Sequence, residues 1–185
     1  MQAKVDLLKK LAYIKDGALT GKGYFAEKIF GYELSLAELY GNGTLEELSE
    51  TQLGMLCLAL VFEPRKSTNR PILKRDTQAL SRLTEDIVNR IHKKERNLKI
   101  PPLSKKYYYH LSPCLRAWMN KENFDTILRY TSADEGEVIR YFRMTLQILR
   151  EILDTHASES LKIKVKHVIK LINRDIIDAE NQLRE

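Results

Sequence analysis

Apolar residues recur at helical spacing along most of this sequence. In residues 76–95 they fall on one side of a predicted helix, and basic residues fall on the other. The positions expected to face inward there are Leu80, Leu83, Ile87, Val88 and Ile91. Residues 53–62, LGMLCLALVF, are almost wholly apolar and predict a buried central helix. The two longest helices are expected over 133–154 and roughly 161–183.

One break in this pattern predicts strands instead of helix. The stretch KDGALTGKG, residues 15–23, contains three glycines, and its Asp16-Gly17 pair suits a tight hairpin turn. A helix followed by a small hairpin resembles the end of a winged-helix unit. The predicted fold class is therefore all-α: a multi-helix bundle with a small N-terminal β-hairpin and a winged-helix-like start.

The chain of 185 residues reads as a single helical domain in four segments. Residues 1–31 form a helix, a hairpin and a helix, and residues 32–63 contain helices that lead into the buried central one. Residues 64–106 are a basic loop, helix and loop, since EPRKSTNRP and NLKIPPLSKK interrupt the helical pattern. Residues 107–185 hold the C-terminal helices, including the one predicted over 133–154.

Positive charge is concentrated in one of these segments. The whole chain has 31 Lys and Arg against 25 Asp and Glu, a net charge of +6. Residues 65–106 contain thirteen of these bases and four acids, so this segment carries +9 and the rest carries −3. Such asymmetry suits a phosphate backbone, an acidic protein face or a solvated basic surface. The secondary basic surface expected here comprises Lys93, Lys94, Arg96, Lys105 and Lys106.

The sequence contains no motif for catalysis or metal binding by this chain alone. GALTGKGY resembles a phosphate loop, but its glycines are one residue too close and a glycine follows Lys22 where Ser or Thr is required. The four histidines and two cysteines lack metal-ligand spacing, so no metal site is expected. Cys57 and Cys114 are expected to be reduced, buried thiols. No signal peptide or membrane-spanning run is visible, which suggests a cytoplasmic, intracellular protein without a membrane partner.

The helix over 133–154 has two sharply different faces. At 100° per residue, its apolar face contains Val138, Ile139, Phe142, Leu146, Leu149 and Leu153. The opposite face carries Arg140, Met144, Gln147 and Glu151 in a line along the axis, flanked by Arg143 and Arg150. This line is either an ordinary solvated face or a surface that contacts a single-stranded nucleic acid through guanidinium and amide groups.

The sequence of this helix, EGEVIRYFRMTLQILREI, resembles the signature helix of the DSHCT domain, the C-terminal helical domain of Ski-like DExH-box RNA helicases of superfamily 2. Three further blocks are similar to that family and occur in the same order. They are LLKKLAYIKDGALTGKGYFAEKI, then ELSLAELYGNGTLEELSETQLGMLCLALVFEPR, and LKIKVKHVIKLINRDIIDAENQL near the C-terminus. Together the four blocks cover nearly the whole chain.

The resemblance implies an accessory domain that packs on a helicase core, helps to wall the nucleic-acid channel and grips the strand during ATP-dependent translocation. The signature helix would be the ratchet helix, with Arg140, Met144 and Gln147 facing the strand and Arg143 adjacent. Met144 stands where the family often has arginine and Gln147 where it often has an acid, which favours sequence-tolerant contacts. The implied partners are the helicase core and single-stranded RNA, with DNA also open. ATP and magnesium would bind the core, so this chain has no catalytic residues and no cofactor of its own.

A different class of function fits the charge distribution. In this alternative the chain is a helical protein–protein interaction module that docks an acidic partner through residues 65–106. Charge reversal at Lys93, Lys94 and Arg96 would then abolish a protein contact and leave RNA binding unchanged. A nucleic-acid role predicts instead that loss of Arg140 and Gln147 impairs RNA handling.

Overall fold

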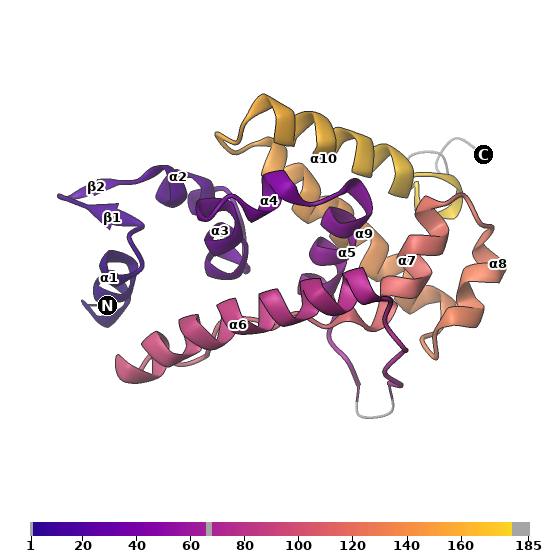
Figure 1. Ribbon diagram of the computed structural model, residues 1–185, viewed down its shortest axis with the longest axis horizontal. Coiled ribbons are helices and arrows are strands. Elements are labelled where there is room, and N and C mark those ends of the chain that lie inside the picture. The colour runs from indigo at the N-terminus through magenta and orange to yellow at the C-terminus, as the bar shows by residue number, and fades with distance from the viewer. Residues whose placement is uncertain (1, 66–67, 179–185) are drawn as a thin grey trace.

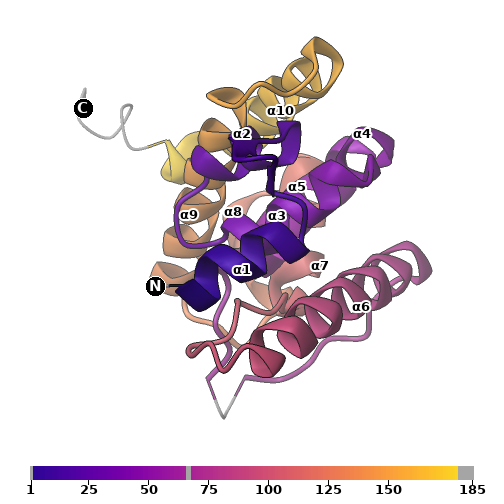
Figure 2. The same cartoon turned by 90° about the vertical axis from the view of Figure 1, so that its left-hand side faces the viewer.

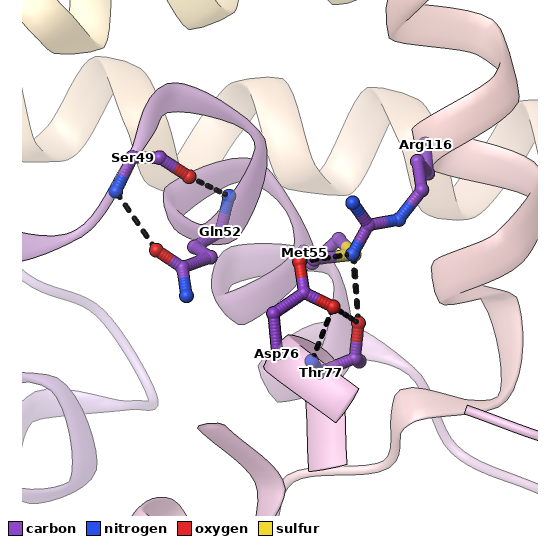
Figure 3. Close-up of polar contacts among 6 residues, drawn as sticks. All are labelled: Ser49, Gln52, Met55, Asp76, Thr77 and Arg116. Carbon is purple, nitrogen blue, oxygen red and sulfur yellow. Dashed lines mark hydrogen bonds and ion pairs between the residues drawn. The ribbon is translucent and has the colours of Figure 1, made fainter. Parts of the chain in front are cut away.

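A buried helix, α5 (Glu50–Val61), lies at the centre of the protein, as the apolar run in its sequence predicts. The computed structural model describes residues 2–65 and 68–178 (Figure 1). A capping box starts α5: Ser49 Oγ accepts from the Gln52 N–H at 3.2 Å, and Gln52 Oε1 accepts from the Ser49 N–H at 3.0 Å (Figure 3). Every residue from Leu53 to Val61 is buried, so the helix has neighbours on all sides.

The C-terminal helices pack around α5. They are α7 (Ser112–Met119), α9 (Glu135–Leu153) and α10 (Glu159–Ile172), with the short α8 (Phe124–Ile127) beside α7 (Figure 1). Single-turn 3₁₀ helices lie at Tyr109–Leu111 and Leu128–Tyr130. Gly54 permits the close approach of α7 and α10, because a Cβ there would lie 3.1 Å from Met119 Sδ and 3.3 Å from Val168 Cγ1.

The N-terminal part contains the predicted hairpin. Helix α1 (Gln2–Lys10) is followed by strands β1 (Ile14–Lys15) and β2 (Ala18–Leu19), which pair antiparallel with Ile14 opposite Leu19. The turn places Asp16 and Gly17 at φ values of 51° and 80°, as a two-residue hairpin loop requires. Helices α2 (Gly21–Glu27), α3 (Glu33–Gly41) and α4 (Thr44–Glu47) then lead to α5 (Figure 1). The predicted all-α bundle with a small N-terminal hairpin is confirmed.

The basic segment is built on one long helix, α6 (Arg75–Asn97), which runs along one side of the molecule (Figures 1 and 2). Its first turn is fixed to α7: Arg116 donates to Asp76 Oδ2 at 2.7 Å and to Thr77 Oγ1 at 2.9 Å (Figure 3). The pKa of Asp76 is lowered; burial opposes ionisation, but the bonds from Arg116 and from the Thr77 N–H outweigh it. On the inner face Leu80, Ile87, Val88 and Ile91 are buried as predicted, whereas Leu83 is 37% exposed. Lys66 lies outside the described residues.

Two predicted helix boundaries are wrong. The signature helix, expected from residue 133, starts at Glu135 with Asp134 as its N-cap, whose side chain accepts from the Glu137 N–H at 2.8 Å. The final helix ends at Ile172 instead of continuing towards residue 183, which itself lies outside the described residues. After Ile172 the chain turns so that Arg174 lies over α7, and Asp175–Ile177 form a 3₁₀ helix. Within the described residues, tertiary contacts of Arg174 thus replace a continuation of the helix directly after Ile172.

Candidate nucleic-acid interface

Helix α9 buries one face and exposes a short polar row on the other. Val138, Phe142 and Leu149 have no exposed surface, and α9 packs on both α5 and α10. Arg140 and Gln147 are exposed on the opposite side. The helix therefore has an apolar and a polar face, but Ile139, which was expected on the apolar face, is only half-buried and borders the polar row.

A shallow surface depression of about 460 Å³, open to solvent and called the α9 groove below, lies along the outer side of α9. Its lining residues all belong to this one helix: Gly136, Ile139, Arg140, Arg143, Met144 and Gln147. The groove therefore brings together the four residues that the sequence predicted to contact a strand. Contact with a strand itself stays a prediction.

The two arginines of the groove differ in what holds them. Arg140 is exposed, and its guanidinium carbon lies 4.4 Å from the centroid of the Tyr141 ring. Arg143 donates from Nε to the Ile177 carbonyl at 3.1 Å and from a terminal nitrogen to the Ile176 carbonyl at 3.0 Å. Arg143 thus fixes the C-terminal 3₁₀ helix beside the groove, a role that its sequence position did not indicate.

Glu151 was placed on the exposed line by helical spacing, and this placement is wrong. Its side chain is buried, with 8% exposure, at the end of the row. One carboxylate oxygen accepts from the Phe30 backbone N–H at 3.1 Å, and the other accepts from Gln147 Nε2 at 3.2 Å. The chain between α2 and α3 therefore closes over the last turns of α9, and Gln147 is the last groove residue of the row.

Charged groups lie near the contact between the α2–α3 connection and Glu151. The pKa of Tyr32 is raised by burial and by the carboxylates of Glu63 and Glu151, while Lys105 acts in the opposite direction. Lys105 also forms an ion pair with Glu63, which follows α5. One of the predicted basic residues therefore lies on this side of the molecule, already paired with an acid.

The other predicted basic residues have different surroundings. Lys93, Lys94 and Arg96 belong to the last turns of α6, where Lys94 donates to the Lys10 carbonyl at 3.2 Å and so caps α1. Lys106 lines a second groove, of about 400 Å³, between α6 and the chain that follows it. The three tyrosines at 107–109 also line this groove: Tyr107 and Tyr108 are half-buried, and Tyr109 is only 5% exposed.

The described residues hold no cluster of three or more His, Cys, Asp or Glu side chains with the arrangement of a metal site. In residues 2–65 and 68–178, none of the helices combines the length and apolar character needed to cross a bilayer. Cys57 and Cys114 are free and fully buried, as expected, and burial raises the pKa of each thiol to about 12.

The sequence profile of the DSHCT (NUC185) domain matches residues 16–180. The chain therefore belongs to the DSHCT family, as the four motif blocks predicted. Its relatives include the Schizosaccharomyces pombe protein named ATP-dependent RNA helicase mtr4, which is 26% identical over 96% of this chain and 17% of that protein. The Caenorhabditis elegans protein named mRNA transport homolog 4 is 30% identical over 94% of this chain and 18% of its own length. The human protein named Exosome RNA helicase MTR4 is 27% identical over 80% of this chain and 15% of its own length.

The chain thus spans less than a fifth of the length of these relatives, and it matches their C-terminal region. It corresponds to one helical domain of those proteins. The catalytic core of those proteins is not in this chain.

Proposed function

We propose that this chain is the C-terminal accessory domain of a Ski-like, ATP-dependent RNA helicase, and that α9 forms one wall of the path taken by single-stranded RNA. The observation that supports the proposal is the groove along α9, whose exposed surface is supplied by Arg140, Met144 and Gln147. Membership of the DSHCT family and the names of its relatives support the RNA helicase context.

The three side chains would bind the strand in different ways. The Arg140 guanidinium would contact phosphate oxygens or stack on a base, because it is exposed and carries a permanent charge. Met144 would supply an adaptable apolar contact, and Gln147 a neutral hydrogen bond. None of these contacts selects one base strongly, so the domain would grip successive nucleotides while the core hydrolyses ATP. Arg143 borders the same groove, and direct contact between it and the strand stays a prediction.

Binding of a labelled single-stranded oligouridylate, measured by fluorescence anisotropy over a range of salt concentrations, tests the proposal. Arg140→Ala should weaken binding and reduce the slope of log K against log salt by about 0.7, the value for one phosphate contact on a single strand. Gln147→Ala should weaken binding without changing the slope, because the amide is neutral. Arg150→Ala is the matched control, since Arg150 is exposed on the same helix but does not line the groove.

The same variants should slow unwinding when they are placed in a helicase that contains this domain, while the ATPase rate changes less. The proposal is wrong if Arg140→Ala and Gln147→Ala both leave RNA affinity and unwinding at the wild-type level. A parallel titration with oligodeoxyuridylate would establish whether the groove distinguishes RNA from DNA.

A further inference from the structure

Phe30 exposes 72% of its surface in the short connection between α2 and α3. The preceding residue, Ile29, is only 1% exposed and anchors the connection in the core. The following residue, Gly31, has φ of +79° and donates its N–H to Glu33 Oε1 at 3.1 Å. The ring therefore projects from a backbone that is fixed on both sides.

The backbone of Phe30 is attached to the proposed strand-binding row. Its N–H donates to Glu151 Oε2 at 3.1 Å, and Glu151 Oε1 accepts from Gln147 Nε2 at 3.2 Å. One buried carboxylate thus links Phe30 directly to the last groove residue of α9. This arrangement puts an exposed aromatic residue at the Gln147 end of the groove.

The chemistry of this corner suits a nucleotide. Lys28, two residues before Phe30, is also exposed and supplies one cation beside the carboxylates of Glu33 and Glu151, which accept from the backbone of the connection. Surfaces that bind single strands combine cations for the backbone with aromatic rings on which bases stack. Every base has a π-face, so a stacking ring would match the sequence-tolerant character of Arg140 and Met144.

We propose that Phe30 stacks on a base of the single strand at the Gln147 end of the α9 groove. This inference rests on the proposed function, because it requires a strand in the groove. It adds a binding residue from a different element, so that the strand is held by α9 on one side and by the α2–α3 connection at its end. If the exposed ring instead made an apolar contact with the helicase core, its removal would leave RNA binding unchanged.

An oligouridylate that contains a single 2-aminopurine tests the stacking, because uridines stack little in the free strand and the 2-aminopurine fluorescence falls when the base stacks on an aromatic ring. Loss of one base–aromatic stack, about 1–3 kcal/mol, corresponds to a rise in Kd of about 5- to 150-fold. Phe30→Leu should show such a rise, with an unchanged salt slope and a smaller fall in fluorescence. Phe30→Trp should restore both quantities, because tryptophan keeps the aromatic face. Tyr130→Leu is the control, since Tyr130 is 46% exposed on the α8 side, away from α9's groove.

The outcomes separate this inference from the proposed function. If Arg140→Ala weakens binding and Phe30→Leu does not, the stacking is wrong and the groove assignment stands. If neither variant changes binding or fluorescence, both are wrong. If Phe30→Leu leaves RNA binding intact but weakens association with the helicase core, the ring is a protein contact and the stacking is overturned. Circular dichroism of each variant verifies that the fold is retained.

Discussion

Arg174 fixes the C-terminal segment to α7, and its replacement by alanine should destabilise the whole domain. The guanidinium carbon lies 3.4 Å from the centroid of the Trp118 ring. One terminal nitrogen donates to the carbonyl of Trp118 at 2.9 Å and to that of Glu122 at 2.7 Å. Trp118 itself has no exposed surface and donates from its indole to the Ile172 carbonyl at 2.9 Å, so the contact lies against the core.

The expected loss follows from these contacts. A partly desolvated cation–π pair contributes about 1–2 kcal/mol, and a hydrogen bond to a charged group about 1.5–3 kcal/mol. These values are not additive, and the Trp118 carbonyl also accepts from the Lys121 N–H at 2.9 Å, so it keeps a partner after truncation. We therefore expect Arg174→Ala to lower the free energy of unfolding by about 3 kcal/mol. At about 2–4 °C per kcal/mol for a domain of this size, Tm should fall by about 6–12 °C.

Thermal unfolding followed by circular dichroism measures this shift. Arg174→Lys should recover less than half of the loss, because an ammonium group cannot stack as a plane while donating to two carbonyls. Arg129→Ala is the control, an exposed arginine on the 3₁₀ helix after α8, and should leave Tm within about 2 °C. A Tm for Arg174→Ala as close to wild type as that of the control would refute the assigned role.

Three further changes have defined outcomes. Gly23→Ala should destabilise the domain by about 2 kcal/mol in chemical denaturation, because its Cβ would lie 2.4 Å from a backbone carbonyl oxygen of the hairpin. Gly21→Ala, whose Cβ meets nothing within 4 Å, should be near neutral, and equal effects would contradict the clash. Cys57 and Cys114 should resist a thiol reagent at pH 8 until denaturant is added, since burial raises each pKa to about 12; rapid native-state labelling would argue against this burial. The pKa of Asp76 is lowered from 3.8, so its ionised form stabilises the fold at neutral pH, and that contribution disappears as pH falls below 3.8. Asp76→Asn should therefore be less stable than wild type at pH 7, with a gap that closes in acid; a gap independent of pH would oppose this.

The elements that local sequence encodes strongly were the ones that could be predicted. The Asp16-Gly17 turn and the apolar run of α5 each carry their own signal, and both occur in the structure. The end of α10 is less evident from the sequence, because apolar residues continue at helical period beyond it. In the structure the segment after Ile172 contacts residues distant in sequence, such as Trp118, which packs against Arg174.

The candidate site was predictable to the same degree. Helical spacing alone placed Arg140, Met144 and Gln147 on one side of a single helix, and the groove is lined by all three. Helical spacing could not reveal the hydrogen bond from Arg143 to the Ile177 carbonyl, because Ile177 is 34 residues away in the sequence. Phe30 was missed for a related reason: a lone aromatic residue in a short connection looks the same in sequence whether its ring is buried or exposed.

The burial of Glu151 determines what Gln147 can offer a strand. The amide nitrogen of Gln147 faces Glu151 and donates to its Oε1 at 3.2 Å, so the amide carbonyl oxygen is directed elsewhere. Arg140 lies seven residues earlier, about 10 Å along the helix axis at 1.5 Å per residue. Under the proposed function the groove therefore presents a permanent cation for phosphate at one point and a neutral amide at the other. The Gln147 carbonyl oxygen can accept from a ribose 2′-hydroxyl or a base amino group, and the amide N–H that does not bond to Glu151 can still donate. The burial of Glu151, which helical periodicity alone had placed in solvent, thus fixes the orientation of the amide that a strand would meet.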